Sequence, residues 1–405
     1  MSFTFGLIHK WSYFQRTIPN SSAFYQPLEQ AIRQNFIPAI TGKNCSDIER
    51  SLFALPCRLG GLGLPNPVET ADRVFNESLS ITEPLAMKII GKDSMLDDVT
   101  AKSVEANKSS CKMANELRLK LTHSQVLSAL PDTLQRLTEL NSESGASIWL
   151  TTLPLRDCGF YLNKEAFRDA LCMRYGWRIK NMAMVCACGE KNTMNHALIC
   201  AKGGFVNKRH NELRDIEAEL LDEVCTSVTT EPRLQPLSGE EIRGNRADEA
   251  RLDISAVGFW RPQAKVFCDV RVFDPNCKSY RGKEPADVYQ LHENIKKADY
   301  NDRILNVERA SLSPLIFSTS GGWGKETTRF NRHLAQLMAE KRNEQYSTVM
   351  AFIRRRLRFS LLRTTLEALR GCRNLKKTFI NRTWKICDLD FNLIDNSNSD
   401  IINLI

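Results

Sequence analysis

The feature that most constrains the fold is a cluster of cysteine and histidine residues near the middle of the chain. Cys186, Cys188, His196 and Cys200 lie within fifteen residues. Three thiolates and one imidazole are a common tetrahedral zinc set, and two close pairs separated by a short loop can wrap one ion. Gly189 follows the first pair, where a tight turn helps the thiolates converge. The spacing predicts a structural Zn²⁺ knuckle, with unrelated buried cysteines as the alternative, since Cys-x-Cys is shorter than the usual Cys-x2-Cys.

The other cysteines indicate a reducing compartment. The chain has 13 cysteines, an odd number, and outside the cluster they are scattered over 405 residues. A secreted disulfide scaffold is typically short with dense cysteines. No apolar run is long enough for a transmembrane helix, and the start of the chain does not resemble a secretory signal. We therefore expect an intracellular, multidomain globular protein with no membrane partner.

Turn and periodicity signals predict an α+β multidomain fold with a helical N-terminal half. Residues 1–68 end in a Gly/Pro-rich run at 55–67, which indicates a structured turn between helices and no nucleotide-binding loop. Residues 69–180 show the apolar spacing of helices. The expected order then continues with the knuckle at 181–210, an α-β-β-β-α-β core at 211–330, basic C-terminal helices at 331–387 and a frayed tail at 388–405.

Within that core, helices are expected at 211–224 and 286–303, and strands at 227–232, 252–258, 265–273 and 314–318. The last crossover is expected to be parallel and right-handed. A turn near residue 261 puts Asp253 opposite Asp269 on the neighbouring strand. Val266, Cys268 and Val270 take the other face, toward a core.

The two aspartates predict a cation site. An aspartate inside a β-rich run is unfavourable, and adjacent carboxylates repel. A divalent cation that prefers oxygen ligands resolves both problems, so Asp253 and Asp269 are candidate ligands for Mg²⁺ or Mn²⁺. Such an ion can activate water and stabilise the charge that develops at phosphorus. The alternative is a pair of salt bridges with Arg251 and Arg271.

Neighbouring polar residues are candidates to complete this site. Arg271 shares a strand face with Asp269. Lys296 or Lys297, on the following helix, could reach the ion and neutralise developing phosphate charge. Glu217 or Glu219, on the preceding helix, could add a carboxylate.

Basic residues predict a polyanionic partner. The net charge is +9, and thirteen Lys and Arg against two Glu lie between residues 341 and 385. Such a concentration favours nucleic acid, although a solvated helix face is the alternative. The candidate contacts in this stretch and upstream are Arg354, Arg355, Arg356, Arg358, Arg209 and His210. His210 could also replace a zinc ligand.

These residues together resemble the C-terminal part of non-LTR retrotransposon polyproteins of the restriction-like-endonuclease class. In that family a reverse transcriptase is followed by a linker, a CCHC zinc knuckle and a PD-(D/E)xK nuclease. The runs Lys10-Trp11-Ser-Tyr13, Arg16-Thr-Ile-Pro19 and 55–67 look like the end of the polymerase thumb. Carried over by position, Cys186, Cys188, His196 and Cys200 look like the knuckle ligands.

The same resemblance implies a restriction-endonuclease-like domain at 211–330. Arg251-Leu252-Asp253 is similar to the family's basic residue-Pro-Asp motif, and Asp269 to its second acid. Arg271 stands where many such nucleases have lysine. In this class the lysine is often displaced to the following helix near a tyrosine, as Lys296 and Lys297 precede Tyr300. The chain departs from the family in lacking the polymerase palm, whose Asp-Asp motif would precede the thumb. We therefore expect no polymerase activity.

Three hypotheses follow. The first is a metal-dependent DNA endonuclease module of a truncated or domesticated retrotransposon, located in the nucleus, with DNA as partner and the RNA of the element as a second candidate. The second is a zinc-containing nucleic-acid-binding protein without catalysis, because Arg271 and Leu252 replace the lysine and proline of the motif. The third is a structural helical protein with fortuitous motifs.

Overall fold

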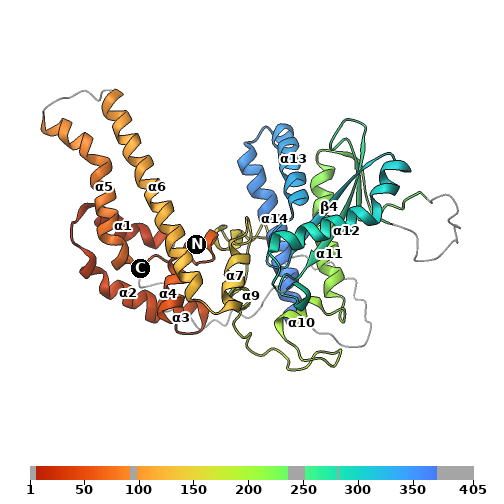
Figure 1. Cartoon of the computed structure of the whole chain (residues 1–405), viewed down its shortest axis with the longest axis horizontal. Coiled ribbons are helices and arrows are strands. Elements are labelled where there is room, and N and C mark those ends of the chain that lie inside the picture. Colours follow the sequence, from red (N-terminus) through yellow and green to blue (C-terminus); the bar gives the residue numbers. More distant parts are fainter. Residues whose placement is uncertain (1–5, 92–97, 236–250, 281, 372–405) are drawn as a thin grey trace.

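The computed structural model describes residues 6–91, 98–235, 251–280 and 282–371. Within these residues the fold is α+β, with a helical N-terminal part followed by a mixed four-stranded sheet that has helices on both faces (Figure 1). The basic residues after 371 and the tail 388–405, which the sequence predicts to be frayed, lie outside the described residues. Among the described helices, none combines the length and apolar character needed to span a bilayer.

The N-terminal helices agree with the prediction of a helical half. They are α1 (Ile8–Thr17), α2 (Gln26–Ala31), α3 (Ile37–Thr41), α4 (Asp47–Ala54), α5 (Pro67–Ile90), α6 (Asp98–Ala129), α7 (Asp132–Ser142), α8 (Ile148–Thr151) and α9 (Lys164–Tyr175). Helices α5 and α6 lie side by side and extend away from the rest of the molecule (Figure 1). The Asn107 side chain of α6 donates to the Ser80 carbonyl of α5 at 2.8 Å.

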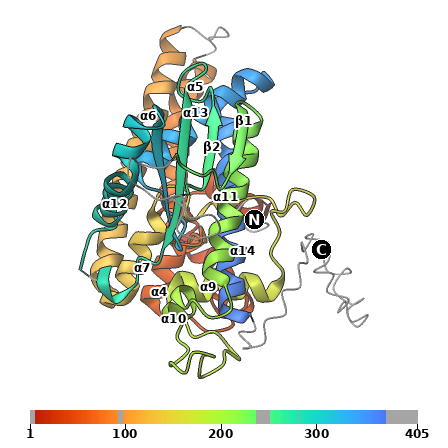
Figure 2. The ribbon, with the colours of Figure 1, turned by 90° about the vertical axis from the view of Figure 1, so that its right-hand side faces the viewer.

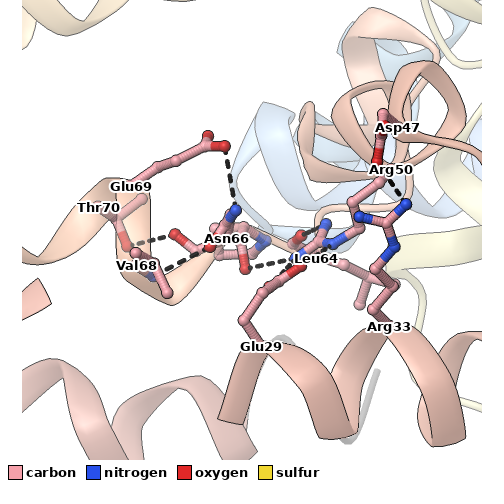
Figure 3. A network of polar contacts seen from close by, with 10 residues as sticks. Glu29, Arg33, Asp47, Arg50, Leu64, Asn66, Val68, Glu69 and Thr70 are labelled. Atoms are coloured by element: carbon pink, nitrogen blue, oxygen red, sulfur yellow. Dashed lines mark hydrogen bonds and ion pairs between the residues drawn. The ribbon is translucent and has the colours of Figure 1, made fainter. Parts of the chain in front are cut away.

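A buried ion pair fixes the Gly/Pro-rich turn between α4 and α5 (Figure 3). Arg50 donates from Nε and Nη2 to the two carboxylate oxygens of Glu29, at 2.6 and 2.7 Å, and from Nη1 to the Leu64 carbonyl at 2.7 Å. Gly61 is required here, because a Cβ at that position would lie 1.9 Å from the Leu55 carbonyl oxygen. The predicted structured turn is confirmed.

The sheet has the strand order β1-β2-β3-β4, and its elements follow the predicted α-β-β-β-α-β order. The first two pairings are antiparallel, and β3 pairs with β4 in parallel, as predicted. The elements are α11 (Phe205–Asp222), β1 (Thr226–Thr230), β2 (Ile254–Val257), β3 (Lys265–Phe273), α12 (Pro285–Asn306) and β4 (Ser311–Ser318).

Alternating side chains of β3 divide the sheet into two faces. Val266, Cys268 and Val270 pack against α11, α13 (Lys325–Arg342) and α14 (Tyr346–Arg370). On the other face, Phe267 packs with Ile304 of α12. Figure 2 shows α12 on one side of the strands and α11 with α14 on the other. The predicted alternation is confirmed, and it leaves Asp269 on the α12 face.

Helix α14 joins the sheet to the N-terminal part. Ile353 and Leu361 belong to the core under the sheet. Leu362 and Leu366 belong to a second core that also contains Phe53 of α4. Helix α14 is therefore largely buried, and even its basic residues are half-buried or, at Arg358, buried, with Arg370 as the exposed exception.

Candidate metal centres and basic surface

The four cysteine and histidine ligand atoms converge, as the sequence predicts. All lie within 4.8 Å of one another. The Sγ atoms of Cys186 and Cys200 are 3.7 Å apart, and Cys188 Sγ lies 3.2 Å from His196 Nε2. Gly189, at φ 93°, donates from its N–H to the Cys186 carbonyl at 2.8 Å and so closes the predicted turn. Three thiols and an imidazole at these separations could hold a metal ion such as zinc.

A short helix, α10 (Met194–Ile199), supplies the histidine. The Thr193 hydroxyl accepts from the His196 N–H at 3.1 Å and caps the helix. Leu198 of α10 is buried in the core shared by α14 and the N-terminal helices. The cluster is thus anchored on its helical side to the body of the protein.

The second candidate centre lies on the hairpin of β2 and β3. Ile254 pairs with Cys268, so the preceding residue, Asp253, lies beside Asp269. The Asp253 N–H donates to the Cys268 carbonyl at 3.1 Å, which extends the ladder to this position. The Val270 N–H donates to Asp253 Oδ2 at 2.6 Å. The structure therefore brings the two predicted aspartates together.

One basic group contacts each aspartate. His210, from α11, places Nε2 3.1 Å from Asp253 Oδ2. Lys296, from α12, places Nζ 2.6 Å from Asp269 Oδ2 and 5.6 Å from the centre of the Tyr300 ring. The Asp269 side chain is only 9% exposed and that of Lys296 16%. His210 is therefore neither a zinc ligand nor a free surface group in this structure, because it holds Asp253.

Burial and neighbouring charges shift the pKa values of the two aspartates in opposite directions. Burial raises the pKa of Asp269 to about 6 in spite of Lys296, and the neighbouring Asp253 contributes to the rise. Burial acts against ionisation of Asp253 too, but the hydrogen bond and charge of His210 hold its pKa below the ordinary value. The pair therefore retains one proton in mildly acidic solution. Two adjacent, proton-sharing carboxylates are a suitable oxygen donor set for a divalent cation, which would displace that proton.

The two candidate lysines differ in their partners. Lys297 Nζ lies 2.6 Å from Glu326 Oε1 on α13, away from Asp269. Lys296 is therefore the lysine at the site. Arg271 is half-buried on the same sheet face as Asp269 and lies near His292. Burial lowers the pKa of His292 to about 4, and the positive charges of Arg271 and Lys296 act in the same direction.

The additional carboxylates suggested by the sequence do not join this site. Glu217 is fully buried on α11, where Oε1 accepts from the Asn331 side chain at 3.0 Å. Helix α11 packs on the sheet face opposite Asp269. Glu219 forms an ion pair with Arg356. Both suggestions are wrong, because helix α11 directs Glu217 toward Asn331 and Glu219 toward Arg356.

Two of the predicted nucleic-acid contacts are also wrong. Arg209 is 2% exposed and donates from Nη2 to the Leu198 carbonyl at 2.9 Å. Arg358 is 5% exposed and donates from Nε to the Ala146 carbonyl at 2.9 Å. Neither guanidinium is exposed on the outer surface of the described structure. Arg356 is half-buried and paired, as described above, and Arg355 is half-buried.

A different basic surface, which we call the tryptophan groove, comprises Trp260, Trp323, Lys325, Arg329 and Arg332. It spans two adjoining cavities of about 510 and 270 Å³. The Arg329 guanidinium lies 5.0 Å from the Trp260 ring centre. The three basic side chains are exposed on one stretch of α13.

Sequence reasoning missed the tryptophan groove, although a signal was present. Trp260 lies two residues after Gly258 and Trp323 directly after Gly322, and both tryptophans lie in turns outside the helices and strands. Tryptophans close in sequence to clustered basic residues, as Trp323 is to Arg329 and Arg332, could have indicated a basic surface with aromatic rings.

A scan against protein-family models gives no match to this chain, and a search of the curated proteins finds no significant relative.

Proposed function

We propose that this protein is a metal-dependent DNA endonuclease, and that it derives from a non-LTR retrotransposon of the restriction-like-endonuclease class. The observation that carries the proposal is the buried pair Asp253 and Asp269, contacted by Lys296 and His210. A nuclear location follows from the proposed substrate.

The two aspartates would hold Mg²⁺ or Mn²⁺. When bound, such a cation lowers the pKa of a water molecule and stabilises negative charge on a phosphate. The chain supplies the positioning. The Val270 N–H and His210 both engage Oδ2 of Asp253, which fixes the orientation of that carboxylate. Lys296 is held against Asp269 and can neutralise charge that develops on a nearby phosphate oxygen.

The tryptophan groove supports DNA as the partner. Lys325, Arg329 and Arg332 present three exposed cations on one helix, next to the rings of Trp260 and Trp323. These positive charges would give affinity for DNA of any sequence, because neutralising phosphates does not depend on the bases.

We also propose Zn²⁺ as the ion of the cysteine–histidine cluster, in a structural role, since all four positions are protein ligands.

One observation favours binding without catalysis as a second candidate function. Lys296 forms an ion pair with Asp269 and can neutralise the charge that a cation would otherwise neutralise. A protein that kept this ion pair would bind nucleic acid through the tryptophan groove but would not cleave it. DNA binding with no cation-dependent cleavage would support this candidate.

Nicking of supercoiled plasmid DNA tests the proposal. The wild-type protein should nick the plasmid with Mg²⁺ or Mn²⁺, and Asp253→Ala should not. Asp222→Ala is the matched control, because Asp222 is exposed at the end of α11 and should leave nicking unchanged. DNA binding, measured by gel shift, should survive in both variants. Asp253→Asn, which preserves the side-chain shape, covers the case in which the alanine variant does not fold. Equal nicking by wild type and the Asp253 variants would overturn the proposal.

A further inference from the structure

A third cavity, of about 660 Å³, lies where the N-terminal helices meet the sheet domain. Its walls come from α7, α9, α10 and α14 and from the loops that follow β3 and β4. It is separate from the carboxylate pair and from the tryptophan groove, since none of their residues lines it. Its volume is in the range of pockets that bind small organic ligands.

The unusual feature of this cavity is Arg358, a buried arginine in its wall. Its Nε donates to the Ala146 carbonyl, but Nη1 is buried and has no hydrogen-bond partner. Gly321, at φ 100°, allows the guanidinium to sit there, because a Cβ at that position would lie 2.5 Å from Arg358 Nε. Burial lowers the pKa of Arg358 to about 9, and the charge of Arg174 acts in the same direction. A buried cation with an unused donor is costly unless an anion accepts from it.

The other charged groups of the wall reinforce this positive character. Arg136 has a buried Nε without a partner, and its Nη2 makes only long contacts of 3.4 Å to two backbone carbonyls. Arg174 donates to hydroxyl and carbonyl oxygens and contacts no carboxylate in the described structure. Asp132 is the acidic residue among the described lining residues, and it is exposed.

Two further acids lie near this wall without lining the cavity. Glu143 accepts a hydrogen bond from the Tyr289 hydroxyl at 3.0 Å, and burial raises its pKa to about 7. Asp274 Oδ1 accepts from the Asn276 N–H and the Thr319 hydroxyl. Neither carboxylate forms an ion pair with Arg358 in the described residues.

We propose that this cavity binds a nucleotide, with its terminal phosphate against Arg358 and Arg136. A guanidinium fork matches phosphate oxygens in geometry and charge. Asn141 and Ser320 line the cavity and can offer further polar contacts, and Leu137, Trp149 and Leu362 give it an apolar part suited to a base. The terminal phosphate could belong to a free mononucleotide or to the end of a strand. The inference does not depend on cleavage at Asp253 and Asp269.

Calorimetric titration of the full chain tests this, without added divalent cation. Adenosine 5′-monophosphate should bind, and adenosine should bind at least tenfold more weakly. Arg358→Met should weaken binding of the monophosphate by about 10- to 100-fold, the usual effect of losing a hydrogen bond to a charged group. Its melting temperature should not fall greatly, because a buried unpaired charge is removed. Arg355→Met is the matched control, since it removes the same charge from the same helix outside the cavity and should leave affinity unchanged.

A second variant keeps the test decisive if Arg358→Met does not fold. Ser320→Phe retains every arginine but fills the cavity, and should also abolish binding. A trinucleotide with and without a 5′-phosphate distinguishes the two sources: tighter binding of the phosphorylated form identifies a strand end, and binding of the mononucleotide alone identifies a free nucleotide. No binding of the monophosphate, equal affinity for adenosine, or unchanged affinity in both cavity variants would overturn the inference.

Discussion

The cysteine–histidine cluster and the carboxylate pair differ in how the chain assembles them. All four cluster residues come from one segment, Cys186 to Cys200, and the chain needs only a turn and one short helix to bring them together. The carboxylate pair takes its parts from α11, β2, β3 and α12, so Lys296 lies 43 residues from Asp253. A local site can form with its own segment, whereas the carboxylate site exists only once α11 and α12 have packed against the β2–β3 hairpin.

This difference predicts opposite sensitivities. Loss of the zinc ion should disturb a local segment, because metal binding supplies much of the folding free energy of a small knuckle. Loss of a carboxylate should disturb chemistry while leaving the fold, because the sheet is stabilised by its apolar faces. The following predictions test the two centres, a buried carboxylate on the opposite sheet face and the tryptophan groove, in order of decreasing expected effect.

The largest effect is expected at the cluster. Cys188→Ser should abolish the one zinc ion per chain that elemental analysis should find in the wild type. Structural zinc contributes about 10–16 kcal/mol in isolated knuckles, so limited proteolysis should cut the variant near this segment. Cys158→Ser, at an exposed cysteine outside the cluster, is the control and should keep its zinc. A folded wild-type protein without zinc would contradict the assignment.

At the carboxylate pair, the two neighbouring lysines should behave differently. Lys296→Ala should slow plasmid nicking by about 2–4 kcal/mol in activation free energy, as loss of a charge-stabilising donor does. Lys297→Ala should change the rate little, because Lys297 pairs with Glu326 instead. Nicking rates at saturating Mg²⁺ measure this. Equal loss in both variants would mean that general charge, and no specific contact, supports the reaction.

A buried carboxylate on the opposite face of the sheet offers a contrast with Asp269. Burial raises the pKa of Glu217 from 4.5 to about 7, against its hydrogen bond from Asn331. Because the folded-state pKa exceeds the unfolded value, stability is highest below about pH 4.5 and falls as the pH rises toward 7. Glu217→Gln should therefore stabilise the protein at pH 8 by about 1–3 kcal/mol and have little effect at pH 4.5. Denaturant unfolding at the two pH values checks this; a variant less stable at pH 8 would contradict it.

The smallest effect is expected at the tryptophan groove. Replacing Lys325, Arg329 and Arg332 with Ala should flatten the salt dependence of DNA binding by roughly one to three units, about one for each lost phosphate contact. The double change of Arg355 and Arg356 to Ala is the comparison, because Arg354 itself lines the groove and lies 5.8 Å from the centre of the Trp323 ring. It should flatten the slope less, because Arg356 is paired with Glu219. Fluorescence anisotropy over a range of salt concentrations distinguishes the two variants. A larger effect at Arg355 and Arg356 would place the DNA on α14.

The sequence predicted the parts of the fold that depend on local pattern. Alternation from Lys265 to Phe273 predicted both the strand and its buried face, and the four cluster residues predicted their own convergence. The turn near residue 261 also predicted that Asp253 lies beside Asp269, because antiparallel register follows from turn position. In each case a short stretch of chain contains all the information that is needed.

The predictions that failed concern contacts between distant segments. Arg358 lies in a charged run that indicates a solvated or DNA-binding helix, yet its Nε donates to Ala146, 212 residues away. Helical spacing cannot show which face of α14 the N-terminal helices will cover. The contact of His210 with Asp253 was missed for the same reason, since it depends on how α11 packs beside the sheet.

The central claim is that Asp253 and Asp269 act together to hold one catalytic cation. The most direct test is a double-mutant cycle of plasmid nicking in Mg²⁺ with Asp253→Ala, Asp269→Ala and the combination, with gel-shift binding and melting temperature as checks on fold. Each single change should reduce nicking to the rate without added cation, and the double change should cost little more, because residues that act as a unit are not additive. Normal nicking by both single variants would contradict the account.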